Sequence, residues 1–130
     1  MILRAQAVSV GVSIGLSNRV TGTGYLGFFT LDSVLQFRGM VQTAFAERGA
    51  PRSVLSWCGG GALVSRDRED ANEINAETIR LRGLIKQGLD QAGFRPVYAR
   101  WLPADKCLNI ALLCGTDECV IRVLDDPFHG

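Results

Sequence analysis

The sequence predicts an α+β fold with a mainly antiparallel sheet and two helices, in the order β-β-α-β-α-β-β-β. Short segments with apolar residues at every second position are joined by tight turns, which is typical of antiparallel hairpins. Only two segments repeat apolar residues every three or four positions, as amphipathic helices do. Adjacent hairpins with so few helices favour α+β over a doubly wound parallel sheet. A chain of 130 residues, 47% hydrophobic and 21% charged, suits a single compact domain over residues 1–130.

The chain is predicted to begin with a hairpin. From Val8 to Leu16 the even positions carry large apolar residues, whereas the odd positions from Ser9 on carry Ser or Gly, so the strand has a large face and a small face. Ser17 to Arg19 form the turn, and Val20 to Phe29 form a second, glycine-rich strand. Because small side chains let another backbone come close, we expect a helix or a second copy of the protein to pack on the small face.

The first helix is expected next. Thr30 or Asp32 caps it, and it runs to about Arg48, where Gly49 and Pro51 close it. Its apolar residues recur at steps of three or four, and they are Val34, Phe37, Val41, Ala44 and Phe45. These side chains give the helix one apolar face with which to pack on the sheet.

A short strand and the second helix follow. Arg52 to Trp57 form the strand, and Gly59 to Gly61 make a bend, a bulge or a loop after it. The helix starts between Ser65 and Asp70 and ends at Gly93. Its apolar face consists of Ile74, Thr78, Leu81, Ile85 and Leu89. Acidic residues crowd its first turns, where the positive end of the helix dipole favours them.

The last third of the chain is predicted to form three strands. Their ranges are Pro96–Trp101, Cys107–Cys114 and Cys119–Leu124. A turn at Pro103 to Asp105 separates the first from the second, and Gly115 to Asp117 close a hairpin between the second and the third. The tail from Asp125 to Gly130 is expected to be loose.

The charge and hydropathy of the chain exclude several partners. The formal net charge is +1, which provides no broad basic surface for nucleic acid or for an anionic membrane. No segment is long and apolar enough to span a bilayer. The run from Met1 to Leu16 is interrupted by Ser or Gly at alternate positions, which suits a strand better than a signal peptide. We therefore expect a cytoplasmic protein that binds neither nucleic acid nor membrane.

The stretch Gly22–Gly27 has the spacing G-x-G-x-x-G. With Val20 and Thr21 before it, the stretch resembles the dinucleotide fingerprint of the short-chain dehydrogenases and reductases over about eight residues. That resemblance implies a pyrophosphate at the N-terminus of a helix that begins at the third glycine. Here the helix is expected only from Thr30 or Asp32, and no Tyr-x-x-x-Lys pair is present. We therefore predict a glycine-rich strand and no dinucleotide cofactor.

The candidate ligand-binding residues surround the second glycine-rich stretch. They are Gly59, Gly60, Gly61, Ser65, Arg66 and Arg68. A strand, a glycine loop and a helix N-terminus can bind an anion through free backbone amides, with an arginine adding charge. The stretch has the spacing of neither a P-loop nor a phosphatase loop. The alternative to a ligand site is a bulge or a bend, with Arg66 paired to nearby acids in solvent.

The cysteines and the single histidine form no strong metal or catalytic pattern. Cys58, Cys107, Cys114 and Cys119 contain no C-x-x-C, and with His129 they fit no common zinc spacing. We expect reduced core cysteines, no metal and no cofactor, and the alternative is a disulfide between Cys114 and Cys119. A nucleophilic Cys58 would need a base, and the only histidine lies in the tail.

Together these observations predict a small, self-associating, non-catalytic binding or interaction module. Its expected partner is another protein or a small phosphate-bearing ligand near the Gly59–Arg68 loop, and self-association to a homo-oligomer would use the N-terminal strand. One alternative is a small hydrolase or transferase that uses Cys58 or the acidic cluster. The acidic cluster consists of Asp67, Glu69, Asp70 and Glu73. A further alternative is a structural subunit of an assembly.

Overall fold

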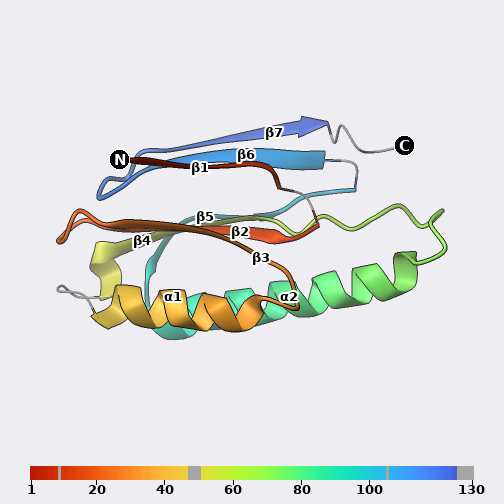
Figure 1. Ribbon diagram of the computed structural model, residues 1–130, viewed down its shortest axis with the longest axis horizontal. Coiled ribbons are helices and arrows are strands. Elements are labelled where there is room, and N and C mark those ends of the chain that lie inside the picture. The colour runs from red at the N-terminus through yellow and green to blue at the C-terminus, as the bar shows by residue number, and fades with distance from the viewer. Residues whose placement is uncertain (9, 47–50, 105, 126–130) are drawn as a thin grey trace.

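The structure is a computed structural model that describes residues 1–8, 10–46, 51–104 and 106–125. Two sheets and one layer of helices are stacked in three layers (Figure 1). The strands are β1 (Ile2–Val8), β2 (Val12–Asn18), β3 (Gly24–Phe29), β4 (Val54–Gly60), β5 (Arg95–Trp101), β6 (Lys106–Leu113) and β7 (Cys119–Asp125). The helices are α1 (Val34–Ala46), α2 (Ala71–Ala92) and the short 3-10 helix η1 (Pro51–Ser53).

The two sheets differ in size and in strand direction. The four-stranded sheet has the order β3-β2-β4-β5, and the three-stranded sheet has the order β1-β6-β7. All neighbouring strands are antiparallel except β4 and β5, which run parallel. The predicted α+β fold with two helices and mainly antiparallel pairing is therefore confirmed, and from β2 onward the elements follow the predicted order. The structure adds β1 ahead of that order.

Strand β2 lies at the centre of the molecule and separates two hydrophobic cores. Its large residues Val12, Ile14 and Leu16 point into the core between the four-stranded sheet and the helices. Its small residues point to the other core, where a Cβ added to Gly15 would lie 3.5 Å from Leu112 Cδ2 of β6. The small face predicted for this strand is thus covered by the second sheet of the same chain.

Both helices lie on one face of the four-stranded sheet (Figure 1). Strands β3 and β4 run in the same direction because each is antiparallel to β2, and β5 is parallel to β4. Helix α1 connects β3 to β4 and α2 connects β4 to β5, so the two helices return in the same direction, side by side. Of the described residues, no helical stretch combines the length and the apolar character that crossing a membrane requires.

The helix ends agree with the capping signals only in part, because α1 begins at Val34, after both Thr30 and Asp32, and Asp70 makes no side-chain cap hydrogen bond at the start of α2. The turn into α1 begins at Thr30, whose amide donates to Ser33 Oγ at 2.9 Å and whose carbonyl accepts from the Ser33 amide at 3.1 Å. Asp70 is the N-cap of α2, and Gly93 ends this helix with a left-handed φ of 73°. The predicted end of the first helix at Arg48 and Gly49, and the predicted loose tail beyond residue 125, lie outside the described residues.

Candidate functional site

The glycine loop predicted after Trp57 does not begin where the sequence indicated. Gly59 and Gly60 are the last two residues of β4, where they pair with β2 on one side and with β5 on the other. The amide of Gly61 donates to the carbonyl of Gly11 at 2.8 Å. Gly59 and Gly60 therefore belong to the sheet, and the chain bends at Gly60 and Gly61, whose φ values are 98° and 60°, as the bend predicted for this glycine run requires. The Gly61 amide is already bonded to Gly11, so it is not free to bind an anion.

Close packing between the two sheets explains Gly59. A Cβ at this position would lie 2.6 Å from Leu108 Cδ2, which belongs to β6 of the three-stranded sheet. That separation is far below van der Waals contact, so Leu108 can approach β4 this closely only where the strand carries no side chain. Position 59 requires a glycine because the three-stranded sheet packs on β4 there, and not because of a local turn.

Two polar side chains of α2 bind the segment that follows β4. Asn75 Oδ1 accepts a hydrogen bond from the Val64 amide at 2.8 Å, and Asn75 Nδ2 donates to the Val64 carbonyl at 3.2 Å. Arg82 Nε donates to the Gly61 carbonyl at 2.8 Å, and its guanidinium lies 5.6 Å from the centroid of the Trp101 ring. Asn75 and Arg82 are two helical turns apart on one face of α2, and their role here is to fix the chain between β4 and the helix.

The remaining candidate ligand residues lie in the turn before α2. Ser65 is half-buried, and its hydroxyl accepts from the Asp67 amide at 3.3 Å. Arg66 is exposed, while Arg68 pairs with Asp70 through Nε and Oδ1 at 3.0 Å. The hydrogen bond from Arg68 lowers the pKa of the Asp70 carboxyl. The glycines are thus buried while Arg66 and Arg68 are exposed, and the ligand site predicted over these residues stays a prediction.

The four cysteines are free thiols. Burial raises the pKa of Cys58 from its ordinary value of 9.0 to about 12, and it raises that of Cys119 to about 11. A thiol with so high a pKa stays protonated near neutral pH and is a poor nucleophile. His129, which the sequence offered as a base or a metal ligand, lies outside the described residues.

The strand on which self-association was expected to rest is not accessible. All seven residues of β2 are buried, both of its edges are paired, and both of its faces are covered. The prediction that this strand supplies the contact between copies is therefore wrong. Whether the chain forms a homo-oligomer through another surface stays a prediction.

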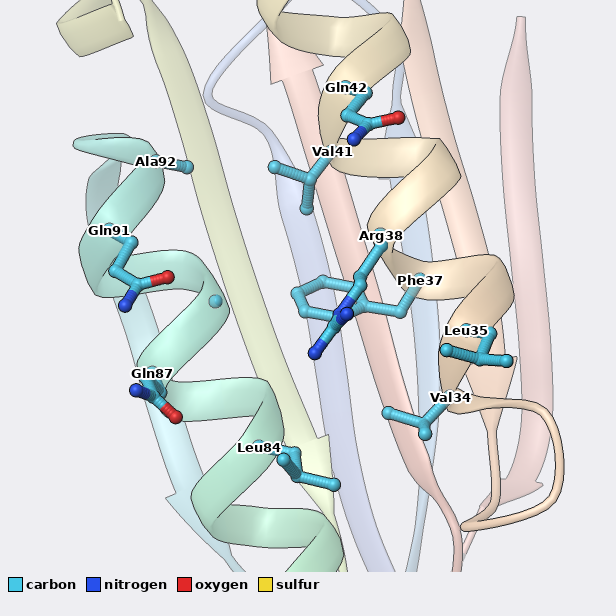
Figure 2. Close-up of a pocket in the computed structure, with 11 residues that line it drawn as sticks. Val34, Leu35, Phe37, Arg38, Val41, Gln42, Leu84, Gln87, Gln91 and Ala92 are labelled. Atoms are coloured by element: carbon cyan, nitrogen blue, oxygen red, sulfur yellow. The ribbon is translucent and has the colours of Figure 1, made fainter.

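The two helices form a groove of about 580 Å³ between them on the outer side of the helical layer (Figure 2). Its apolar walls come from both helices, with Val34, Leu35, Val41, Leu84 and Ala92 as their side chains. Its lining on α1 runs from Val34 to Gln42, and at about 1.5 Å per residue the groove extends for roughly 12 Å along the helix. The groove is therefore long enough for about two turns of another helix.

The floor of the groove is formed where the helices approach each other closely. A Cβ on Gly88 of α2 would lie 2.6 Å from Phe37 Cε1, so the ring of Phe37 packs directly against the backbone of α2. Phe37 is buried and also meets Phe29 of β3 edge to face, with ring centroids 5.7 Å apart. This contact sets how closely the two helices approach each other at Phe37 and Gly88.

Polar side chains line the rim of the groove. Arg38 extends from α1 toward α2, while Gln87 and Gln91 lie along the outer side of α2 (Figure 2). Within the described part of the chain, Arg38 forms no ion pair. Leu35, also at the rim, is 72% exposed, which is a large apolar surface for one residue to leave in water. The groove thus combines exposed apolar area with the positive charge of Arg38.

The sequence contains an indication of this groove on α2, beside the apolar stripe that packs on the sheet. Leu84, Gly88 and Ala92 recur every four residues on α2, beside the stripe that packs on the sheet. A second apolar stripe on a helix that already has a buried face indicates a second contact surface. The matching residues of α1 are distant in the sequence, so periodicity within one helix could not join the two halves.

The comparisons with known proteins assign no family. No protein-family model matches the chain, and no curated protein matches it at a significant level. The candidate function therefore rests on the geometry of the groove.

Proposed function

We propose that this protein is a non-catalytic interaction module that binds a short amphipathic helix of a partner protein in the groove between α1 and α2. The observation that carries the proposal is an apolar groove about two helical turns long, open to solvent and bordered by both helices. Helix-in-groove recognition uses apolar side chains at positions i, i+3 or i+4 and i+7 of the bound helix. The proposal keeps the interaction-module function that the sequence predicts and assigns it to another surface.

The charge at the rim supports a partner of particular chemistry. Arg38 is the cation that lines the groove, and its other polar residues are the uncharged amides Gln42, Gln87 and Gln91. A carboxylate on the bound helix would pair with Arg38, while the glutamines can donate to and accept from its polar flank. The expected ligand is therefore an amphipathic helix with an acidic residue beside its apolar stripe.

Selection from a displayed library of amphipathic helical peptides tests this function. Peptides enriched on the wild-type protein are expected to carry the apolar spacing and an Asp or Glu, because those groups complement the groove. Val41→Glu places a charge on the apolar wall and is expected to weaken binding of the selected peptides by about tenfold or more. Val20→Glu, the same change at an exposed turn outside the groove, is the matched control and is expected to leave binding unchanged.

A charge exchange makes the test specific for Arg38. Arg38→Glu is expected to weaken binding of the acidic peptides, and replacing their acidic residue with Lys is expected to restore it. No enrichment of any peptide, or equal binding to the wild type and to Val41→Glu, would show that the groove is not a helix-binding site.

A further inference from the structure

A second cavity, of about 400 Å³, lies on the other side of α2, between this helix and the edge of the four-stranded sheet. Residues of β4, β5, α2 and η1 line it, and none of these residues lines the groove between the helices. Its volume is within the range of about 300–1,000 Å³ that is usual for small-molecule sites. Its lining therefore decides which class of molecule it fits.

Two aromatic side chains line this cavity on the helix side of the sheet. Phe94 is buried and Trp101 is half-buried, and both pack in the core between the four-stranded sheet and the helices, whereas the ring of Tyr98 packs into the core between the two sheets. The guanidinium of Arg82 lies over the Trp101 ring, at 5.6 Å from its centroid, and holds the ring in place. Aromatic walls whose rings are held in place favour a flat ring in the ligand, because rings stack with little loss of side-chain freedom.

Small polar groups lie at the bottom of the cavity. Ser56 and Cys58 are two residues apart on β4, so their side chains point to the same side of the sheet. Both are 3% exposed, which places a hydroxyl and a thiol in an otherwise apolar interior. A polar substituent on the ligand ring would find hydrogen-bonding groups there.

The opening of the cavity carries a net positive charge. Arg52 of η1 and Lys86 of α2 line it together with Asp90. Within the described residues neither Arg52 nor Lys86 takes part in an ion pair. Because the cations outnumber the acid in this lining, the opening favours one negative charge on the ligand.

We propose that this cavity binds a small planar aromatic anion, with its ring between the aromatic walls and its carboxylate, sulfonate or phosphate at Arg52 and Lys86. The site is independent of the groove between the helices and adds a small-molecule ligand to the proposed interaction module. A nucleotide and an aromatic carboxylate share this chemistry.

Binding of 1-anilinonaphthalene-8-sulfonate, an aromatic anion that fluoresces when it leaves water, tests the proposal. The wild type is expected to bind this probe about tenfold or more tightly than the neutral N-phenyl-1-naphthylamine, because only the sulfonate can pair with the cations. Competition by adenosine monophosphate and by indole-3-carboxylate then distinguishes a nucleotide from an aromatic carboxylate as the ligand class.

Variants locate the bound probe. Ala99→Phe fills the cavity from an exposed position on β5, and Lys86→Glu reverses a charge at its opening. Each is expected to weaken probe binding by about tenfold, whereas Arg80→Glu, the same kind of charge reversal elsewhere on α2, is expected to leave binding within about twofold of the wild type. Val41→Glu in the groove is also expected to leave it unchanged, which separates this site from the proposed helix-binding function.

Either of two results would overturn the proposal. Probe binding that survives both Ala99→Phe and Lys86→Glu, or equal binding of the anionic and the neutral probe to the wild type, excludes an anion site in this cavity. Far-ultraviolet circular dichroism of each variant checks that it has folded, and Ala99 and Lys86 are both exposed positions where substitution is tolerated.

Discussion

Among single residues, Cys58 shows how burial controls chemistry. The thiol lies in the core between the sheet and the helices, and its pKa rises from 9.0 to about 12 because burial penalises the thiolate. Below pH 9 the thiol is protonated in the folded and the unfolded chain alike. Between pH 9 and about 12 only the unfolded chain loses the proton, so the folded state loses stability as the pH rises.

The difference in the Cys58 pKa between the folded and the unfolded chain predicts that the free energy of unfolding depends on pH. Replacing Cys58 should reduce this dependence. A single thiol of this kind is expected to lower the free energy of unfolding by up to about 1.4 kcal/mol for each pH unit in that interval. Urea unfolding of the wild type and of Cys58→Ala across the interval measures it, and the variant is expected to show the smaller fall. Equal slopes for the two proteins would mean that Cys58 ionises normally in the folded state.

Arg82 is the residue whose polar contacts are expected to matter most for stability. Arg82→Met removes the hydrogen bonds to the Gly61 carbonyl and the contact with Trp101, so we expect a loss of about 1–3 kcal/mol in the free energy of unfolding. Arg80→Met, an exposed arginine on the same helix, is expected to change it by no more than about 0.5 kcal/mol. Equal losses in the two variants, measured by urea unfolding, would contradict this role.

For helices and strands, the periodicity of apolar residues predicted the elements themselves. It did not predict features that depend on contact with another layer of the fold. Both helices and the hairpins were predicted because their apolar residues repeat with the period of the element. Strand β1 was missed because its residues alternate weakly, with Arg4 and Gln6 among them. Gly59 to Gly61 were predicted as a bend, a bulge or a loop. Gly60 and Gly61 have the positive φ values of such a bend, but Gly59 lies inside β4 under Leu108, a contact that a glycine run cannot reveal.

The packing of β4 against β6 predicts a coupling between two substitutions. Gly59→Ala is expected to cost about 1–3 kcal/mol because its Cβ would clash with Leu108, and Leu108→Ala is expected to cost about 2–5 kcal/mol through the cavity it leaves. In the double variant the new methyl group occupies part of that cavity. The loss in the free energy of unfolding measured for the double variant should therefore be smaller than the sum of the single losses by about 0.5 kcal/mol or more. Strictly additive losses would contradict this contact.

Across the whole molecule, stacking of two sheets and one helical layer leaves the helices with one face in the core and one toward solvent (Figure 1). The sequence predicted the helices but not the groove, because Phe37 and Gly88 come together only when α1 and α2 lie side by side. The same stacking buries β2, so the small residues that suggested a contact between copies serve the contact between sheets. The proposed partner site therefore lies on the helical layer, whereas the sequence predicted it near the Gly59–Arg68 loop.

Methyl NMR of the protein during titration with a selected helical peptide shows whether a helix occupies the groove. The expected result is that the methyl resonances of Val34, Leu35, Val41 and Leu84 shift together, because these side chains line the groove. The resonances of Ile2 and Val120, exposed on the three-stranded sheet, are expected to stay in place. Shifts at Ile2 and Val120 with an unchanged groove would contradict helix binding between α1 and α2.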